Sequence, residues 1–62
     1  MATKIVWHGV FVSRNNEQIH IERTFTAIDM IEILYLISEE ITIQVALGND
    51  FVEGEIKDMW EI

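Results

Sequence analysis

The chain has 62 residues, no cysteine and a formal net charge of −7, and half of its residues are hydrophobic. These values exclude disulfides and a disordered chain, and no stretch approaches the roughly 18 apolar residues of a membrane span. A domain of this length buries only about 60% of the surface that its unfolded chain exposes. We therefore expect a single domain, residues 1–62, that is stabilised further by forming a homodimer.

The N-terminal segment gives no sign of secretion. MATKIVWHGV contains one lysine and lacks the long apolar stretch and the small-residue cleavage site of a secretory signal. We expect a cytoplasmic protein, located in the host cytoplasm if a phage encodes it.

The negative charge is concentrated in the second half of the chain. Three basic and two acidic residues precede position 29, whereas one basic and nine acidic residues lie from position 29 onward. Such a surface repels phosphate groups, so direct binding to nucleic acid or to an anionic membrane is disfavoured. A basic protein surface is the kind of partner that this charge attracts.

Two strands joined by a loop are predicted in the first 25 residues. Residues 4–12 are rich in β-branched and aromatic side chains and are apolar on both faces, which is typical of a central strand. The polar residues 13–18 form a loop, and residues 19–25 alternate apolar and polar side chains. We expect the two strands to form a hairpin.

A helix is predicted over residues 27–40. Thr26, followed three positions later by Asp29, resembles a capping box, and the acidic residues near the start favour a helix over a strand. Glu39 and Glu40 at the predicted C-terminus oppose the helix dipole, which suggests that the helix ends before them or that they serve another purpose.

The remaining residues complete the predicted sheet. Residues 41–47 alternate in the manner of a half-buried third strand, residues 48–50 form a turn, and residues 51–62 form an additional strand or an extended arm. The fold class is therefore α+β, a ββαβ unit with one helix packed on a small antiparallel sheet of strand order 2-1-3. The third strand would lie at an edge, where it could pair with its own copy across a two-fold axis unless the C-terminal segment covers it.

The sequence contains no recognisable catalytic or metal-binding motif. His8 and His20 lie on adjacent predicted strands and could approach each other, but two histidines without a third ligand are more often partly exposed strand residues than a metal site. Glu39 and Glu40 point in different directions and do not form the converging pair that general acid–base chemistry needs. We expect no enzyme activity, no cofactor and no metal.

The predicted helix carries more apolar surface than packing on one sheet requires. Ile28, Ile31 and Tyr35 lie at the edge of its apolar arc beside Glu32, and Leu36 stands among the acidic residues. In a two-fold dimer, paired helices would form an apolar pocket with an acidic rim, suited to a protruding apolar side chain of a basic partner. The alternative is that the arc serves only the core or the dimer interface and that the acidity serves only solubility.

The segment IEILYLISEEITIQVAL, together with Glu22 on the second strand, resembles the small dimeric uracil-DNA glycosylase inhibitors of Bacillus podoviruses, a family of acidic, cysteine-free proteins near this length. The helix of that family carries an aromatic-Glu-aliphatic-Leu-Tyr string. Residues 31–35 match this string except that Ile31 replaces the aromatic residue. The resemblance covers about residues 5–47, and residues 51–62 have no clear counterpart.

The resemblance implies a protein that mimics DNA. Glu22 and Glu32 would bond to the phosphate-binding cleft of the enzyme. An apolar pocket lined by Ile31 and Tyr35 would capture the leucine that the enzyme inserts into duplex DNA. The leading hypothesis is thus a viral inhibitor of uracil-DNA glycosylase, a basic DNA-processing enzyme, with these partner-binding residues: Glu22, Ile28, Ile31, Glu32, Tyr35 and Leu36. The alternatives are an acidic interaction module, an inhibitor of another nucleic-acid enzyme such as a CRISPR nuclease, or a structural dimer without mimicry.

Overall fold

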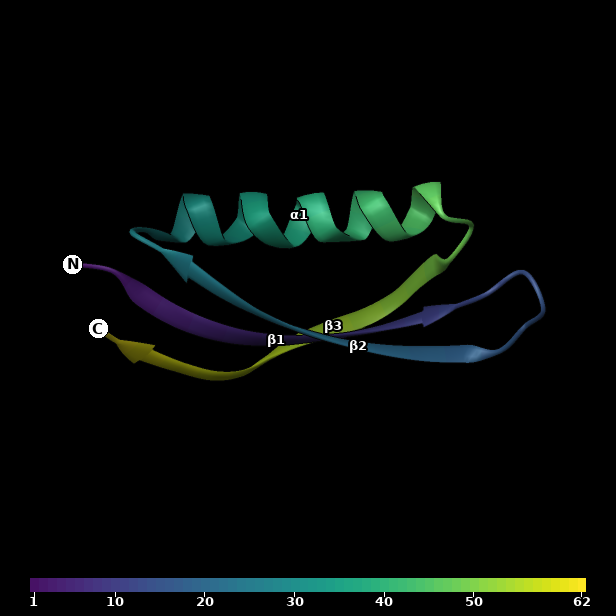
Figure 1. The fold of residues 1–62 in the computed structure, drawn as a ribbon, viewed down its shortest axis with the longest axis horizontal. Helices are drawn as coiled ribbons and strands as arrows, with labels where there is room; N and C mark the ends of the chain where they lie inside the picture. Colours follow the sequence, from purple (N-terminus) through teal and green to yellow (C-terminus); the bar gives the residue numbers. More distant parts are fainter.

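The computed structural model describes residues 1–62 and contains three strands and one helix. In chain order the elements are β1 (Thr3–Val12), β2 (Gln18–Ala27), α1 (Met30–Ala46) and β3 (Asp50–Glu61). The strands form one antiparallel sheet in the order β2-β1-β3, and α1 lies along one face of it (Figure 1). The predicted α+β class, the ββαβ order and the central position of the first strand are confirmed.

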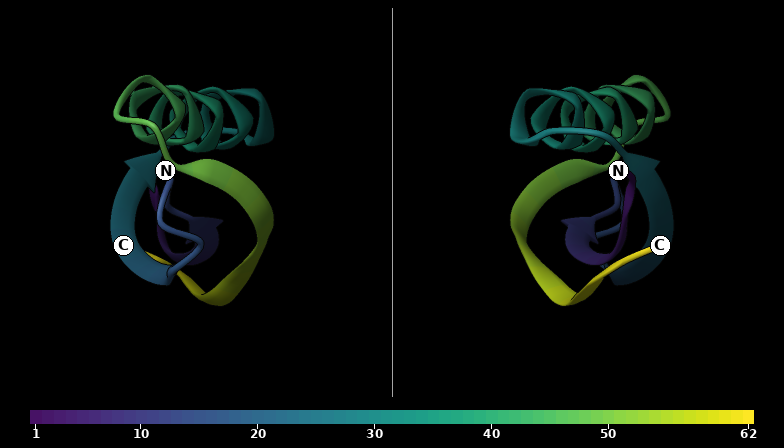
Figure 2. Two further views of the ribbon diagram at one scale, coloured as in Figure 1. Left: turned by 90° about the vertical axis from the view of Figure 1, so that its right-hand side faces the viewer. Right: turned by 90° about the vertical axis from the view of Figure 1, so that its left-hand side faces the viewer.

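The molecule has two layers, one formed by α1 and the other by a strongly twisted sheet (Figure 2). Its Cα trace is elongated and extends 42 × 18 × 12 Å. No second helix covers the face of the sheet that points away from α1, which we call the outer face. Apart from Val10, which is buried, the side chains on this face are partly or fully exposed to solvent.

The hairpin formed by β1 and β2 agrees with the prediction. The two strands pair along their whole length, from Thr3 opposite Ala27 to Val12 opposite Gln18. In the connecting loop, the Ser13 hydroxyl accepts hydrogen bonds from the backbone N–H groups of the second and fourth residues after it. A polar side chain that bonds to nearby backbone stabilises such a turn without help from the core.

The hydrophobic core lies between the central strand and α1. Ile5, Ala27 and Ile33 form a buried cluster, and Leu36 and Ile37 pack against it. Only six apolar residues are buried in the whole chain: Ile5, Trp7, Val10, Phe11, Ala27 and Ile33. Because so few side chains leave water completely, the isolated chain has a small hydrophobic driving force for folding.

The indole of Trp7 lies across two glycines that face each other on neighbouring strands. Gly9 of β1 is directly opposite Gly54 of β3. A Cβ atom at Gly54 would lie 2.8 Å from Cζ2 of Trp7, and a Cβ atom at Gly9 would also meet the indole ring. The two glycines therefore leave the space in which a tryptophan can pack flat against the sheet and remain only 3% exposed.

The helix begins later than predicted. Its N-cap is Asp29, whose carboxylate accepts a hydrogen bond of 2.8 Å from the backbone N–H of Glu32. Thr26 is not the cap, because Thr26 and Ala27 still belong to β2 and Ala27 is buried in the core. The capping pattern was thus present in the sequence, but shifted by three residues from the predicted position.

The prediction of a strand at residues 41–47 is wrong, because α1 continues to Ala46. The segment also fits a helix, because Ile41 and Gln44 continue the helical spacing of Ile33 and Ile37. All four side chains lie on the side of α1 that faces the sheet. The helix terminates before Gly48, which adopts a left-handed φ of 95° that favours glycine. No helix of the structure has the length and apolarity needed to cross a membrane.

The C-terminal segment is the third strand. Residues 50–61 pair with β1, so the strand interpretation of this segment is confirmed, and β3 takes the place that was predicted for residues 41–47. The pairing has two irregularities, which insert Val52 and Lys57 as extra residues opposite β1. The edge of the sheet on this side is β3.

Candidate partner-binding surface

The solvent-facing side of α1 is strongly apolar. Its sheet-facing side consists of residues that are buried or half-buried, among them Ile33, Ile37 and Gln44. On the opposite side, Ile31, Leu34 and Tyr35 have exposed fractions of 79%, 61% and 64%. Ile28, in the connection just before α1, is 69% exposed. We call these four residues the helix ridge. Grouped apolar exposure of this kind is a common feature of surfaces that contact other molecules.

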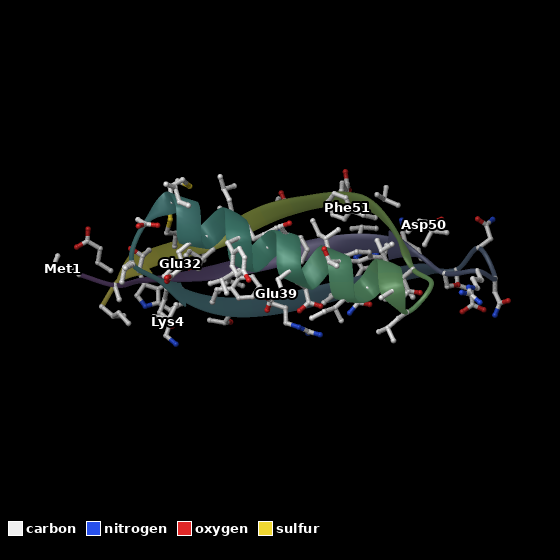
Figure 3. The ribbon with its side chains drawn as sticks, turned by 90° about the horizontal axis from the view of Figure 1, so that it is seen from above. Met1, Lys4, Glu32, Glu39, Asp50 and Phe51 are labelled. Atoms are coloured by element: carbon white, nitrogen blue, oxygen red, sulfur yellow. The ribbon has the colours of Figure 1, made fainter.

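Two carboxylates flank the helix ridge. Glu32 precedes Tyr35 by three residues and Glu39 follows it by four, so both lie on the same side of the helix as Tyr35. Figure 3 looks onto α1 and shows Glu32 near its first turn and Glu39 further along it. A shallow hollow of about 220 Å³ is lined by Tyr35, Ser38, Glu39 and Thr42. The apolar ridge therefore has an acidic rim and a depression beside its aromatic residue.

Glu32 has a structural role in addition to its place on the rim. Its carboxylate accepts a hydrogen bond of 3.1 Å from the backbone N–H of Ile28, while its own backbone N–H donates to Asp29. These reciprocal bonds resemble a capping box and fix the first turn of α1. Glu32 and Ile28 are thereby held in a defined position before any partner arrives.

Two of the predicted site residues lie away from the ridge. Leu36 does not stand among acidic residues, because it is half-buried and packs against the core cluster of Ile5, Ala27 and Ile33. Glu22 is opposite His8 in the hairpin and so lies on the outer face of the sheet, on the far side from α1. The structure brings together Ile28, Ile31, Glu32 and Tyr35, and places Leu36 and Glu22 elsewhere.

Sequence reasoning missed Leu34 and Glu39 as members of this surface. The predicted helix ended at residue 40, so Glu39 was assigned to a helix end, whereas it lies near the middle of α1. The orientation of the helix is also set by Glu40, which turns toward β2 and forms an ion pair of 3.0 Å with Arg23. Leu34 lies outside the sheet-facing side that carries Glu40 and is 61% exposed.

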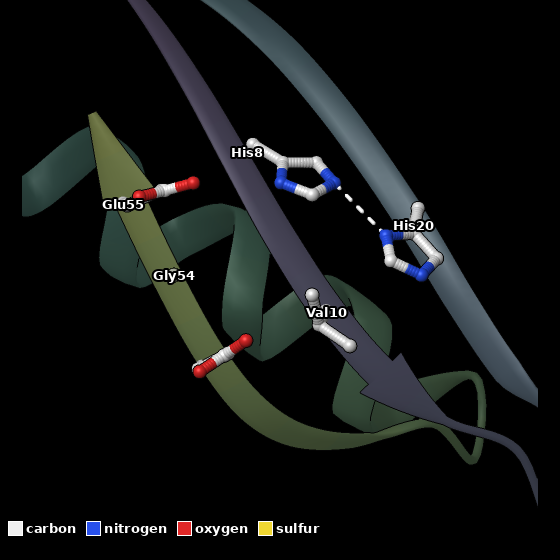
Figure 4. A pocket seen from close by; sticks show the side chains of 6 residues that line it. His8, Val10, His20, Gly54 and Glu55 are labelled. Atoms are coloured by element: carbon white, nitrogen blue, oxygen red, sulfur yellow. Dashed lines mark hydrogen bonds between the residues drawn. The ribbon is translucent and has the colours of Figure 1, made fainter. Parts of the chain in front are cut away.

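The outer face of the sheet carries a second group of polar residues. His8 Nε2 and His20 Nδ1 lie 3.1 Å apart and share a hydrogen bond. The two rings line a hollow of about 240 Å³ together with Glu53 and Glu55 of β3, and Figure 4 shows the two imidazoles on one side of it and Glu55 on the other. The predicted approach of the two histidines is therefore observed.

The two surfaces carry exposed apolar side chains and exposed carboxylates. No group of three or more His, Cys, Asp or Glu side chains in the structure could hold a metal ion. The carboxylates that line the outer hollow, Glu53 and Glu55, are both largely exposed to solvent. Exposed charges and exposed apolar side chains are suited to binding a complementary protein surface.

Comparisons with protein-family models, with curated proteins and with solved structures returned no match for this chain.

Proposed function

We propose that this protein is a viral inhibitor of uracil-DNA glycosylase that acts as an acidic mimic of DNA. The observation that carries the proposal is the helix ridge, an exposed apolar surface on α1 with Glu32 and Glu39 at its rim. A mimic of DNA needs negative charge to enter a basic cleft and an apolar anchor to exclude water once it is there.

The charge of the molecule is available to a partner. Of the eleven acidic residues, only Glu40 and Glu55 form ion pairs with a basic side chain, which leaves nine carboxylates without such a partner. A surface with this excess of one sign attracts a basic protein over a distance and accelerates the encounter. A cleft that normally binds the phosphates of DNA has the complementary charge.

The helix ridge supplies the apolar anchor. Tyr35 is 64% exposed, is the only tyrosine of the chain and borders the hollow on α1. Aromatic side chains in such positions contribute most to the binding energy of protein interfaces. The choice of uracil-DNA glycosylase as the target rests on the resemblance of residues 31–35 to the helix of its known phage inhibitors.

The experiment that tests this proposal is a uracil-excision assay. The protein is mixed in micromolar excess with a bacterial uracil-DNA glycosylase, and release of uracil from DNA is measured. We expect excision to stop, and to resume as salt is raised, because ions screen the charges of the two surfaces. Undiminished excision at every salt concentration contradicts the proposal. Inhibition that is independent of salt indicates an apolar interaction module without mimicry.

We propose in addition that the active form is a homodimer in which two helix ridges pair around a two-fold axis and leave between them an apolar pocket for a side chain of the partner. The small core of the single chain and the size of the exposed ridge support this arrangement. Sedimentation at low micromolar concentration should give the mass of a dimer, and Leu34→Glu should give a monomer because it places a charge in the ridge. Val52→Glu is the matched control, since Val52 is also about half exposed, at 54%, but lies on β3. A monomeric wild-type protein contradicts the arrangement.

A further inference from the structure

β3 is an edge strand that nothing covers. The sheet order β2-β1-β3 leaves one side of β3 unpaired, and all 12 of its residues are exposed. Five of them are large apolar residues with exposed fractions of 40–54%: Phe51, Val52, Ile56, Met59 and Trp60. The other edge strand, β2, differs because alternate side chains are half-buried. An open edge with exposed apolar side chains is a template for pairing with another strand.

The two faces of β3 have different chemistry. Phe51, Ile56 and Met59 are opposite Phe11, Trp7 and Ile5 of β1, so they lie on the side of the sheet that holds α1. By contrast, three acidic residues are opposite Val10, His8 and Val6 and lie on the outer face: Glu53, Glu55 and Asp58. A strand that pairs with β3 would therefore meet apolar side chains on one face and carboxylates on the other.

The charge of β3 decides which strand can pair with it. The strand contains five acidic residues and a single lysine, Lys57. When two β3 strands pair antiparallel about Gly54, in the middle of the strand, Glu53 lies opposite Glu55 and Asp50 opposite Asp58, which is destabilising. The expectation that the sheet edge pairs with its own copy is therefore disfavoured now that β3, and not residues 41–47, forms this edge.

We infer that the free edge of β3 binds an extended segment of a partner protein in which basic and apolar residues alternate. The basic side chains would pair with Glu53 and Glu55 on the outer face, and the apolar ones would pack beside Ile56 on the other face. Residues 53–56 form the regular part of the strand between the two irregularities at Val52 and Lys57, so we place the centre of recognition there. This mode of binding adds a strand to the sheet and uses backbone hydrogen bonds for affinity. It is separate from the helix ridge and does not depend on the identity of the target enzyme.

A synthetic peptide of about nine residues with alternating lysine and valine tests the inference, because a strand of that length spans β3 from Glu53 to Ile56 with room at both ends. Its binding is measured by titration calorimetry, and exchange of the β3 amide hydrogens is followed by NMR. Two versions of the peptide serve as matched probes, one N-methylated at the lysines and the other at the valines. Alternate amides of a strand point to opposite edges, so one version should bind about tenfold more weakly than the other.

The expected result is slower exchange of amides in residues 53–56 on addition of the peptide, with β2 unchanged. Glu53→Lys combined with Glu55→Lys should abolish binding of the lysine peptide and allow binding of a glutamate–valine peptide, and both side chains are exposed, so the variant keeps the fold. Equal binding of the two N-methylated versions overturns the inference, because charge alone would then account for binding. The inference is also overturned if, without peptide, exchange of the β3 amide hydrogens slows as the protein concentration is raised. A second copy of the chain would then occupy the edge.

Discussion

Replacing Phe11 with alanine is expected to remove most of the stability of the domain. Phe11 and Ile5 are the largest side chains that are fully buried, and the Phe11 ring contacts the rings of Trp7 and Phe51 at centroid distances of 6.4 Å and 5.4 Å. Truncation of a buried phenylalanine costs about 3–5 kcal/mol. A domain of this length has a total free energy of unfolding of about 3–9 kcal/mol. Urea unfolding followed by circular dichroism should show a largely unfolded Phe11→Ala chain.

Phe51→Ala is the matched control for this substitution. It removes the same atoms from the neighbouring strand, but Phe51 is 40% exposed, so its truncation creates less of a cavity. We expect Phe51→Ala to lower the free energy of unfolding by about half as much as Phe11→Ala or less, because the effect of truncation scales with the apolar area that is buried. Similar urea midpoints for the two variants would contradict the expectation that the fully buried Phe11 contributes more stability than the partly exposed Phe51.

Replacing Tyr35 with alanine is expected to weaken partner binding by about 30-fold or more, or roughly 2 kcal/mol, the magnitude typical of an aromatic hot spot. Tyr35 is 64% exposed and does not belong to the buried core, so the change should leave the fold intact. The dissociation constant for uracil-DNA glycosylase, measured by titration calorimetry, gives the effect directly. Tyr35→Phe should retain most of the affinity if the ring is the anchor.

Glu53→Gln provides the comparison for Tyr35→Ala. Glu53 lies on β3, is exposed and forms no ion pair, so removal of this one charge should cost less than about 1 kcal/mol. Circular dichroism of both variants checks that they fold. A larger loss of affinity for Glu53→Gln than for Tyr35→Ala would place the main binding site on β3 instead of on the helix ridge.

The strands of the hairpin were predictable because their patterns are strong and local. Residues 19–25 place Ile19, Ile21 and Phe25 on one face, and residues 4–12 combine β-branched and aromatic side chains on both faces. The sequence of residues 41–47 was misleading because a period of two over seven residues, rich in Ile and Val, is compatible with both a strand and the end of a buried helix. The true signal was Gly48, whose left-handed backbone ends the helix.

The C-terminal strand was ambiguous for a specific structural reason. The extra residue at Lys57 moves Ile56 and Met59 onto the same face of β3, although they are three positions apart. A spacing of three is typical of a helix, so the irregular pairing makes a strand look helical in the sequence. Such an irregularity depends on the pairing with β1 and could not be located from β3 alone.

The candidate site was predicted in part. Ile28, Ile31 and Tyr35 were expected at the edge of the apolar arc; Ile31 and Tyr35 are exposed on α1, and Ile28 is exposed just before it. Leu36 was misplaced because the rotation of the helix follows from its packing on the sheet and from the Arg23–Glu40 ion pair. Glu22 lies on the polar face that the alternation of β2 already indicated, and this face turns away from α1.

The central claim, that the protein occupies the DNA-binding cleft of uracil-DNA glycosylase, is tested most directly by the excision assay carried out at several concentrations of DNA substrate. If the protein mimics DNA, it competes with the substrate, so the apparent KM should rise with inhibitor concentration while kcat stays constant. A fall in kcat at unchanged KM would contradict occupation of the cleft, and unchanged kinetics would contradict inhibition altogether.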